Sequence, residues 1–228
     1  MDVKIYDKLA KKYDFMVNLV SFGIEEIWRR LFVREIRKYV DNGVLIDVAS
    51  ATGKMAKSLD FDRMYLIEPS EEMVKVIIEN FKKLGYIQDG FRLKKSNKEV
   101  FIIKSTAEDF EIDEKADLIV SFMGIRNFDD IKKGIKNLDR HLKVGGYFGI
   151  VEMVKRDDFF GKLVLWYMNK VVPFVASFFG MRKEYEKLGE SVASLSEEDI
   201  LANFKEYDII VNKSLFPVAK MFILKKER

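Results

Sequence analysis

Short runs of consecutive apolar residues alternate with segments of helical periodicity along this chain, and no other sequence feature restricts the fold as strongly. The run Val44–Val48 follows Asn42-Gly43, is rich in β-branched residues and precedes a stretch of small residues, which is typical of a strand buried on both faces. Four later runs complete a predicted set of parallel strands: Met64–Ile67, Phe101–Ile103, Leu118–Val120 and Tyr147–Met153.

The segments between these runs carry helical signals. Apolar residues at three- and four-residue spacing between Ile24 and Ile36 predict an amphipathic helix within a helical first 40 residues, after a break at Ser21-Phe22-Gly23. Ser70, followed by two glutamates, predicts another helix start. Further helices are expected over residues 54–59, 129–142 and 157–203, and the glycine pair Gly145-Gly146 is expected to stop the second of these. This alternation predicts a doubly wound, mostly parallel sheet with helices on both faces.

The end of the chain breaks the alternation. Tyr207–Val211 and Ala219–Leu224 resemble strands and are separated only by a short turn that contains Pro217. We therefore expect a C-terminal antiparallel hairpin at or near one edge of the sheet, which makes seven strands in all. Methyltransferases of this fold end in such a hairpin, whereas dinucleotide-dependent dehydrogenases do not.

Composition excludes several kinds of chemistry. The 228 residues include no cysteine and only one histidine, His141, which excludes disulfide scaffolds, cysteine nucleophiles and Cys/His metal sites, and we expect no metal. A net charge of +3 lacks the concentrated positive excess of a nucleic-acid-binding surface. No secretory signal is visible, so a cytoplasmic protein is expected.

The loop after the first predicted strand is the expected ligand site of a doubly wound sheet. A phosphate-binding P-loop would need a glycine at Val48, and the dinucleotide fingerprint would need one at Ala51, so both interpretations fail. A loop for S-adenosylmethionine (SAM) fits better, because Asp47 lies at the end of the strand and small residues continue to Gly53. Glu68 lies 21 positions after Asp47, at the end of the second strand, where it could accept both ribose hydroxyls. The loop alone does not exclude an ordinary tight turn.

Motifs spread over nearly the whole chain match one family. Asp47–Gly53 agrees at five of seven positions with Asp-Val-Ala-Thr-Gly-Thr-Gly, and Gly124-Ile125-Arg126-Asn127 is similar to Gly-Leu-Arg-Asn. Shorter matches occur at Tyr13–Met16, Ser21–Gly23, Trp28–Arg30, Ser70–Met73, Leu142–Gly146 and Tyr185–Ser191. On these motifs the chain resembles the ubiquinone/menaquinone biosynthesis C-methyltransferase family (UbiE-like), which has the class I SAM-dependent methyltransferase fold.

The resemblance implies an enzyme with a single SAM-dependent methyltransferase domain that releases S-adenosylhomocysteine. Within it we expect N-terminal helices over 1–40, a Rossmann-like cofactor-binding core over 41–153, a helical cap over 154–196, and a final helix and strand hairpin over 197–228. The expected cofactor-binding residues are Tyr13, Asp47, Ala49, Ser50, Thr52, Gly53, Glu68, Pro69, Met73, Thr106, Ala107, Glu108 and Phe122.

Three positions at this expected cofactor site depart from the family pattern. Ala51 replaces a glycine of the loop, Thr106 replaces an Asp or Asn near the adenine, and Phe122 replaces a serine. An alanine at position 51 is accommodated if its φ is negative and is strained if the loop requires a positive φ.

The implied reaction transfers the sulfonium methyl group of SAM to a ring carbon of a prenylated (hydro)quinone precursor in menaquinone or ubiquinone biosynthesis. That carbon becomes nucleophilic when the adjacent phenol loses its proton, so the protein must align the reactants and stabilise a phenolate. Arg126 is the expected stabilising group, and because it stays cationic it cannot be the base. Asn127 is expected to orient the ring oxygen or a water, and the base is either water or a carboxylate such as Asp14.

Two other functions stay open: a methyltransferase for another small apolar or phenolic acceptor, and a catalytically silent methyltransferase fold that acts as a binding protein. The segment Phe159–Phe179 is unusually aromatic and carries Lys162 and Lys170, so it is expected to cap the active site, to contact a membrane peripherally where a prenyl tail enters, or both. We expect a small apolar substrate and no nucleic-acid partner, and the sequence does not distinguish a monomer from a homodimer.

Overall fold

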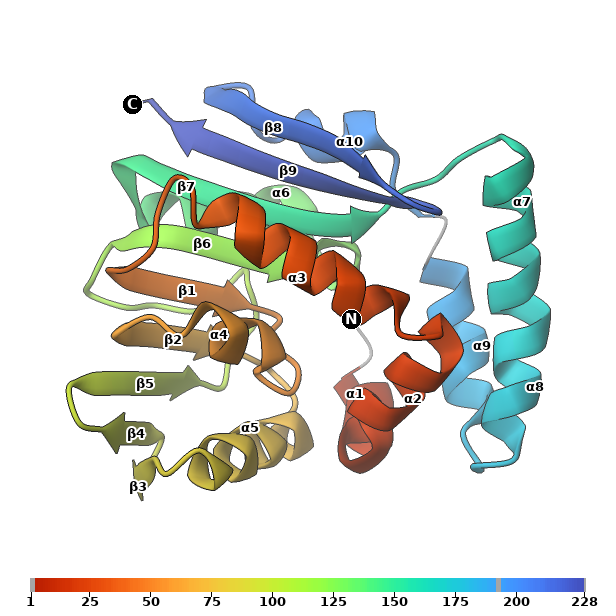
Figure 1. The fold of residues 1–228 in the computed structure, drawn as a ribbon, viewed down its shortest axis with the longest axis horizontal. Helices are drawn as coiled ribbons and strands as arrows, with labels where there is room; N and C mark the ends of the chain where they lie inside the picture. The colour runs from red at the N-terminus through yellow and green to blue at the C-terminus, as the bar shows by residue number, and fades with distance from the viewer. Residues whose placement is uncertain (1–2, 192–193, 228) are drawn as a thin grey trace.

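Strands and helices alternate in the computed structural model, which describes residues 3–191 and 194–227. The side chains of residues 187–190, which include part of the Tyr185–Ser191 motif, lie outside the described part. The five predicted parallel strands are all present, as β1 (Val44–Val48), β2 (Arg63–Ile67), β5 (Lys98–Ile103), β6 (Ala116–Phe122) and β7 (Leu142–Met153). Within the described residues the sheet has the order β3-β4-β5-β2-β1-β6-β7-β9-β8 (Figure 1). The doubly wound, mostly parallel class is confirmed.

The C-terminal hairpin is also confirmed. Strand β8 (Tyr207–Leu215) forms the edge of the sheet, and β9 (Ala219–Lys226) lies between β7 and β8, antiparallel to both. The sheet nevertheless has nine strands rather than seven. The additional strands, β3 (Ile87–Asp89) and β4 (Arg92–Lys95), are short, charged and mostly exposed, with only Leu93 fully buried, so they carry no apolar run that could reveal them.

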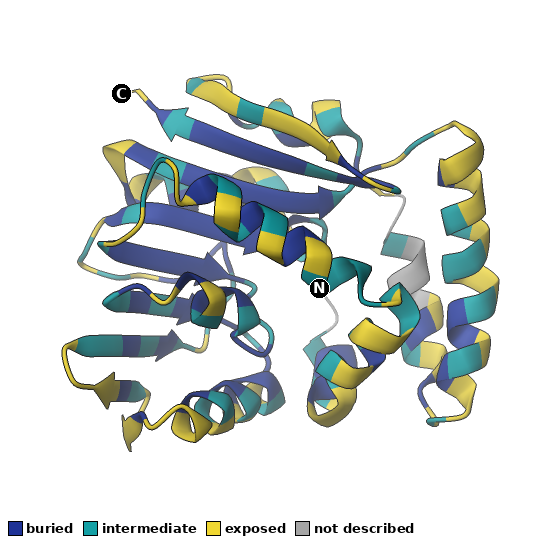
Figure 2. Ribbon diagram, viewed as in Figure 1, coloured by how far each residue is buried: buried dark blue, intermediate teal, exposed yellow. Residues whose placement is uncertain are grey.

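Neighbouring residues of a strand point to opposite faces of the sheet, so the apolar runs make both faces apolar. Helices cover each of these faces. On one face, Leu45 and Leu118 pack with α3 (Ile24–Ile36), α4 (Lys54–Leu59) and α5 (Glu71–Lys83). On the other, Ile46 and Ile119 pack with α6 (Ile131–Arg140) and α10 (Glu197–Leu201). Figure 2 shows the central strands buried between these layers.

The transition from α6 to β7 corrects one expectation. Helix α6 ends at Arg140, and His141 is its C-cap, with Nδ1 2.9 Å from the Asn137 carbonyl oxygen. Strand β7 begins directly at Leu142, so Gly145-Gly146 does not stop the helix. These glycines instead lie where the β6–β7 register shifts between the pairs Ala116↔Leu142 and Leu118↔Tyr147, and Gly145 has a φ of +78°.

The remaining helices gather beyond the carboxyl ends of the parallel strands (Figure 1). They are α1 (Val3–Leu9), η1 (Ala10–Lys12), α2 (Tyr13–Ser21), α7 (Phe159–Trp166), the π-helical η3 (Tyr167–Val171), α8 (Val172–Ser177) and α9 (Arg182–Ser191). All of them except η1 and α7 contribute to an apolar cluster that joins Leu9 and Met16 to Val172 and Tyr185. In the described part of the chain, no helix has the length and apolar character needed to cross a bilayer.

Candidate active site

A cavity of about 530 Å³ lies between the sheet and the helices beyond its carboxyl ends. Its polar lining comes mainly from the N-terminal helices and from the loops after β1 and β6: Tyr6, Tyr13, Asp14, Glu25, Arg29, Asp47, Ser50, Thr52, Lys54 and Arg126. Its apolar lining comes mainly from α2, α3, α7, η3 and the β8–β9 turn: Val17, Val20, Phe22, Ile24, Trp28, Phe160, Leu163, Val164, Trp166, Met168, Phe216 and Val218. The cavity therefore combines charged and polar lining residues with a larger set of apolar ones.

The loop after β1 brings backbone and small side chains to this cavity. Ala49, Ala51 and Gly53 have φ values of 55°, 49° and 74°, so the chain turns through three left-handed residues before α4. The Ser50 hydroxyl lies 2.7 Å from the Asp47 carbonyl oxygen and 3.1 Å from that of Ile67, which fastens the loop to β2. Of the predicted cofactor-binding residues in this loop, Ala49, Ser50 and Thr52 line the cavity, whereas Gly53 does not.

Two buried carboxylates end the first two strands. The Asp47 carboxylate accepts a hydrogen bond from the Ala56 N–H at 3.1 Å, and the Glu68 carboxylate accepts from Ala51 N at 2.8 Å and Ser70 N at 3.0 Å. Burial raises the pKa of each to about 7, although these N–H groups oppose the shift. Asp47 lines the cavity, while Glu68 is not among the residues that line it and is bonded to the loop through Ala51 N.

The N-terminal helices are held over this loop by acidic side chains. Asp14 accepts a hydrogen bond from the Thr52 hydroxyl at 2.8 Å and pairs with Lys54 at 3.3 Å. Asp7 accepts from the Ser70 hydroxyl at 2.6 Å, beside the start of α5. Of the site residues predicted from the sequence, Tyr13 and Asp14 line the cavity, whereas Met73 is fully buried in a cluster with Tyr6.

Arg126 comes from η2 (Ile125–Asn127), directly after β6, and its guanidinium pairs with Glu152 near the end of β7. Glu152 is completely buried and also accepts a hydrogen bond from Met153 N at 3.0 Å. The neighbouring negative charge raises the pKa of Arg126 despite its burial, so the guanidinium stays charged. Arg126 lines the main cavity, but Asn127 lines a second, smaller one, and its Nδ2 lies 3.5 Å from the Met123 carbonyl oxygen.

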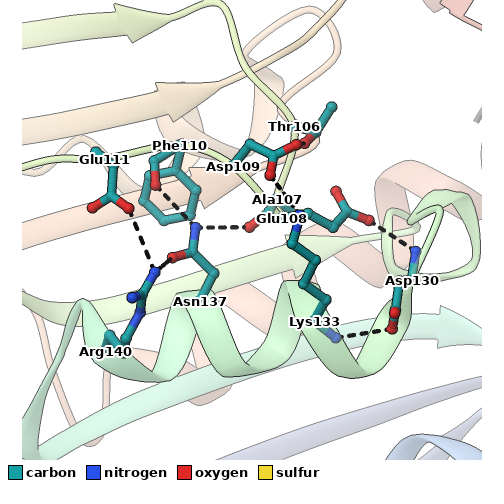
Figure 3. Close-up of polar contacts among 10 residues, drawn as sticks. All are labelled: Thr106, Ala107, Glu108, Asp109, Phe110, Glu111, Asp130, Lys133, Asn137 and Arg140. Atoms are coloured by element: carbon teal, nitrogen blue, oxygen red, sulfur yellow. Dashed lines mark hydrogen bonds and ion pairs between the residues drawn. The ribbon is translucent and has the colours of Figure 1, made fainter.

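The second cavity is only about 30 Å³ and contains the remaining predicted cofactor residues. It is lined by Ala49, Pro69, Thr106, Ala107, Glu108 and Asn127, among others. Figure 3 shows that polar contacts join residues 106–111 to α6. Asn137 donates to the carbonyl oxygens of Ala107 and Phe110 at 3.1 and 2.9 Å, and Glu108 accepts from Asp130 N at 3.1 Å.

The structure also adds residues to the site that sequence reasoning did not select. Arg29 is one of them: it is buried, lines the cavity, and its guanidinium lies 5.3 Å from the ring of Phe122, a predicted cofactor-binding residue that also lines the cavity. Tyr6 and Tyr185 belong to helices far apart in sequence and meet in this cavity. For Glu152 a signal existed, because it is an acidic residue within the apolar run Tyr147–Met153. No comparable signal marks Tyr6.

This arrangement can hold a polar ligand against the loop after β1 and an apolar one against α7. A buried guanidinium can stabilise an oxygen that gains negative charge, and it acts more strongly where water is excluded. Paired carboxylates at adjacent strand ends can accept hydrogen bonds from a diol. The cavity is therefore suited to a group transfer between two bound small molecules.

Comparison with known proteins agrees with this arrangement. A sequence model of the ubiE/COQ5 methyltransferase family matches residues 2–209. The ubiquinone/menaquinone biosynthesis C-methyltransferase UbiE of Geotalea daltonii is 32% identical to this chain over 203 residues, which cover 86% of this chain and 82% of the relative. The demethylmenaquinone methyltransferase of Thermotoga maritima is 28% identical over 231 residues, or 97% and 94% of the two chains.

Solved structures share the fold. A SAM-dependent methyltransferase of Clostridium acetobutylicum matches with a TM-score of 0.65 at 16% identity, covering 98% of this chain and 99% of that one. A second match is a structure from Methanococcus maripaludis, assigned as a SAM-dependent methyltransferase. It has a TM-score of 0.62 at 20% identity and covers 97% of this chain and 94% of that one.

Proposed function

The chain belongs to the ubiE/COQ5 methyltransferase family and is a SAM-dependent methyltransferase, and we propose that its acceptor is a ring carbon of a prenylated hydroquinone. The observation that carries this proposal is the composition of the main cavity, where the Arg126 guanidinium lines a space whose other wall is apolar. Quinone precursors, for which the relatives are named, join a phenolic ring to an apolar tail. The phenolic ring suits the Arg126 guanidinium, and the tail suits the apolar lining of the same cavity.

The residues after β1 and β2 fit the cofactor. SAM supplies an electrophilic methyl group on its sulfonium when it is bound. Glu68 and Asp47 are the candidates for its ribose hydroxyls and neighbouring polar groups, and the small side chains from Ala49 to Thr52 leave the backbone open to the cavity. Thr106, Ala107 and Glu108, the candidates for the adenine, line the second cavity, which at about 30 Å³ is much smaller than the main one.

Arg126 is proposed to stabilise the phenolate of the acceptor. A positive charge within a few ångströms lowers the pKa of an acidic group by about 1–3 units. The ion pair with Glu152 fixes the guanidinium and balances part of its charge, so Glu152 is a positioning residue. Asp14 is engaged by Thr52 and Lys54 and is better placed to hold α2 on the cofactor loop than to remove a proton from the acceptor.

Methyl transfer to a demethylmenaquinol-type acceptor tests the proposed function. Purified protein, labelled SAM and a reduced prenylated naphthoquinone with one free ring position should give a C-methylated product. Transfer only to tail-free phenols would instead favour another small phenolic acceptor. A failure to bind SAM or S-adenosylhomocysteine at millimolar concentration by calorimetry would contradict the enzyme function itself.

Removal of the guanidinium should affect turnover rather than cofactor binding. Arg126→Gln alone leaves Glu152 buried without a counter-charge, which costs about 3–5 kcal/mol of stability. The double variant Arg126→Gln/Glu152→Gln removes both charges and is the cleaner test. We expect its kcat to fall about 100-fold or more, with the SAM Kd unchanged. Normal turnover in a folded double variant would remove Arg126 from the mechanism.

Exposed aromatic residues support a peripheral membrane contact, which we propose as the route by which the acceptor arrives. Phe22 is 78% exposed and Phe216 is 69% exposed, and both also line the cavity together with the exposed Trp166. These three residues, the mouth residues, come from the α2–α3 turn, the end of α7 and the β8–β9 turn. Lys162 and Lys170 are exposed on α7 and η3, where they could contact anionic headgroups.

A further inference from the structure

An ion pair in the lining of the main cavity joins α2 to the first residue of α4. The Nζ atom of Lys54 lies 3.3 Å from Oδ1 of Asp14, and the same oxygen accepts a hydrogen bond from the Thr52 hydroxyl at 2.8 Å. All three residues line the cavity. The side chains of Asp14 and Lys54 are 36% and 32% exposed, so a ligand of the cavity can contact both charged groups.

The other cations of the cavity lining are already held by carboxylates. Among the described residues that line the cavity, these cations are Arg29 and Arg126. The Arg29 guanidinium pairs with Glu25, and its side chain is only 5% exposed. The Arg126 guanidinium pairs with Glu152, and its side chain is 14% exposed. Lys54 is therefore the cation of the lining that is best able to pair with a ligand.

The same comparison selects Asp14 among the carboxylates. The other acidic residues of the lining, within the described part of the chain, are Glu25, which Arg29 holds, and Asp47, which is almost fully buried. Both contacts of the Asp14 carboxylate with described residues are made by Oδ1, so Oδ2 is left without a partner among them. Asp14 can therefore keep its bond to Thr52 and accept another hydrogen bond from a ligand.

A neighbouring carboxylate and ammonium group are complementary to a zwitterion, in which an ammonium and a carboxylate share one carbon. SAM carries such a group at its amino-acid end. An ion pair between exposed side chains contributes little to stability, whereas hydrogen bonds between charged groups are stronger than those between neutral ones. Exchange of the contact between Asp14 and Lys54 for two contacts with a zwitterion is therefore favourable.

We propose that Asp14 and Lys54 bind the amino-acid end of SAM. The Asp14 carboxylate accepts a hydrogen bond from the α-ammonium group, and the Lys54 ammonium group pairs with the α-carboxylate. The cofactor then bridges α2 to the start of α4. Because α2 also supplies Val17 and Val20 to the apolar lining, the bound cofactor fixes one side of the acceptor site. This inference depends on the cofactor and not on the proposed acceptor.

Calorimetry with three thioether ligands tests each half of the assignment. S-adenosylhomocysteine has both charged groups, its decarboxylated form keeps the amine but not the carboxylate, and methylthioadenosine has neither. Lys54→Met should raise the Kd of S-adenosylhomocysteine about tenfold or more, the value of one hydrogen bond between charged groups, and should not weaken binding of the other two. Asp14→Asn should weaken binding of the first two ligands by a similar factor and leave the Kd of methylthioadenosine unchanged.

Lys57→Met is the matched control, since Lys57 lies three residues later on α4 and is not among the residues that line the main cavity. It should bind all three ligands as the wild type does, and a loss equal to that of Lys54→Met would assign the effect to net charge and overturn the inference. Weaker binding of methylthioadenosine to either site variant, or unchanged binding of S-adenosylhomocysteine to either, would also overturn it. A failed methyl-transfer assay would contradict the proposed acceptor and leave these binding measurements decisive.

Discussion

At the scale of single residues, the loop after β1 carries a strained alanine. Ala51 has a φ of 49°, the positive value for which its extra methyl group is unfavourable. We expect Ala51→Gly to raise the free energy of unfolding by about 1 kcal/mol. Ala56→Gly, five residues later in α4, should lower it by about the same amount because glycine weakens a helix. Urea denaturation of both variants checks the prediction, and a destabilised Ala51→Gly would contradict it.

Glu68 makes cofactor binding depend on pH. Burial raises its pKa to about 7, whereas a glutamate in an unfolded chain ionises near pH 4.3. The stability that this proton uptake contributes is present at low pH and is lost as the pH rises through about 7. Binding has the opposite sign, because ribose hydroxyls donate to the ionised carboxylate.

We therefore expect SAM to bind about tenfold more tightly at pH 8 than at pH 6, as measured by calorimetry. Any titration of SAM itself affects the wild type and Glu68→Gln equally. The difference in pH dependence of SAM binding between the two proteins therefore isolates the contribution of Glu68. The variant should bind SAM more weakly at pH 8 and lose most of the pH dependence. An equal pH dependence in both proteins would assign it to another group.

At the scale of elements, one amide connects α6 to the segment that lines the second cavity. Asn137 is buried, and its Nδ2 donates to two carbonyl oxygens of residues 107–110 (Figure 3). Asn137→Ala should lower the free energy of unfolding by about 2–3 kcal/mol, because two buried carbonyl groups lose their donor. It should also alter the SAM Kd, while kcat at saturating SAM stays near wild type.

Lys133→Ala is the control for that prediction. Lys133 pairs with Asp109 of the same segment, but both side chains are largely exposed, so the pair contributes little. Thermal denaturation should give this variant a melting temperature close to that of the wild type, and calorimetry should give it a similar SAM Kd. A larger effect of Lys133→Ala than of Asn137→Ala would show that the buried amide does not hold the segment.

At the scale of the whole molecule, three distant parts of the chain meet at the mouth of the cavity. Trp28 of α3 donates from Nε1 to the Phe216 carbonyl oxygen at 2.8 Å, and Arg156 donates to the Pro217 carbonyl oxygen at 3.3 Å. These bonds hold the β8–β9 turn beside α3, with Phe22 and Trp166 on the other sides of the cavity. Figure 2 shows exposed residues along the neighbouring outer surface of α7 and α8.

The mouth residues should govern vesicle binding. Replacement of Phe22, Trp166 and Phe216 by serine should reduce cosedimentation with anionic vesicles about tenfold or more, because three large apolar side chains no longer enter the interface. The control replaces Ile87 and Phe91, which are exposed on the opposite edge of the sheet, by serine and should bind as wild type does. No retention of the wild type on vesicles would contradict the membrane contact.

Local sequence was sufficient to predict most of the helices and strands and the location of part of the site. Buried parallel strands need continuous apolar runs, and a helix start needs a capping residue, so β1, β2 and the Ser70 cap of α5 were predictable. Strands β3 and β4 were not, since they are stabilised by pairing at an exposed edge and not by burial. The position of Asp47 and the small loop residues at the cavity was predictable because strand ends in this fold meet at one edge, whereas Arg126 was selected by its resemblance to the family motif Gly-Leu-Arg-Asn.

The sequence by itself determined the fold class, the family and the loop after β1 as the expected SAM site, because these depend on short-range patterns that a single segment contains. Only the tertiary structure decided that Glu152 neutralises Arg126, that Glu108 is bonded to Asp130 N, and that Tyr185 of α9 lines the same cavity as Tyr6 of α1. The physical reason is that charge pairing and hydrogen bonding act over a few ångströms in space. They join residues whose separation along the chain carries no information about their contact.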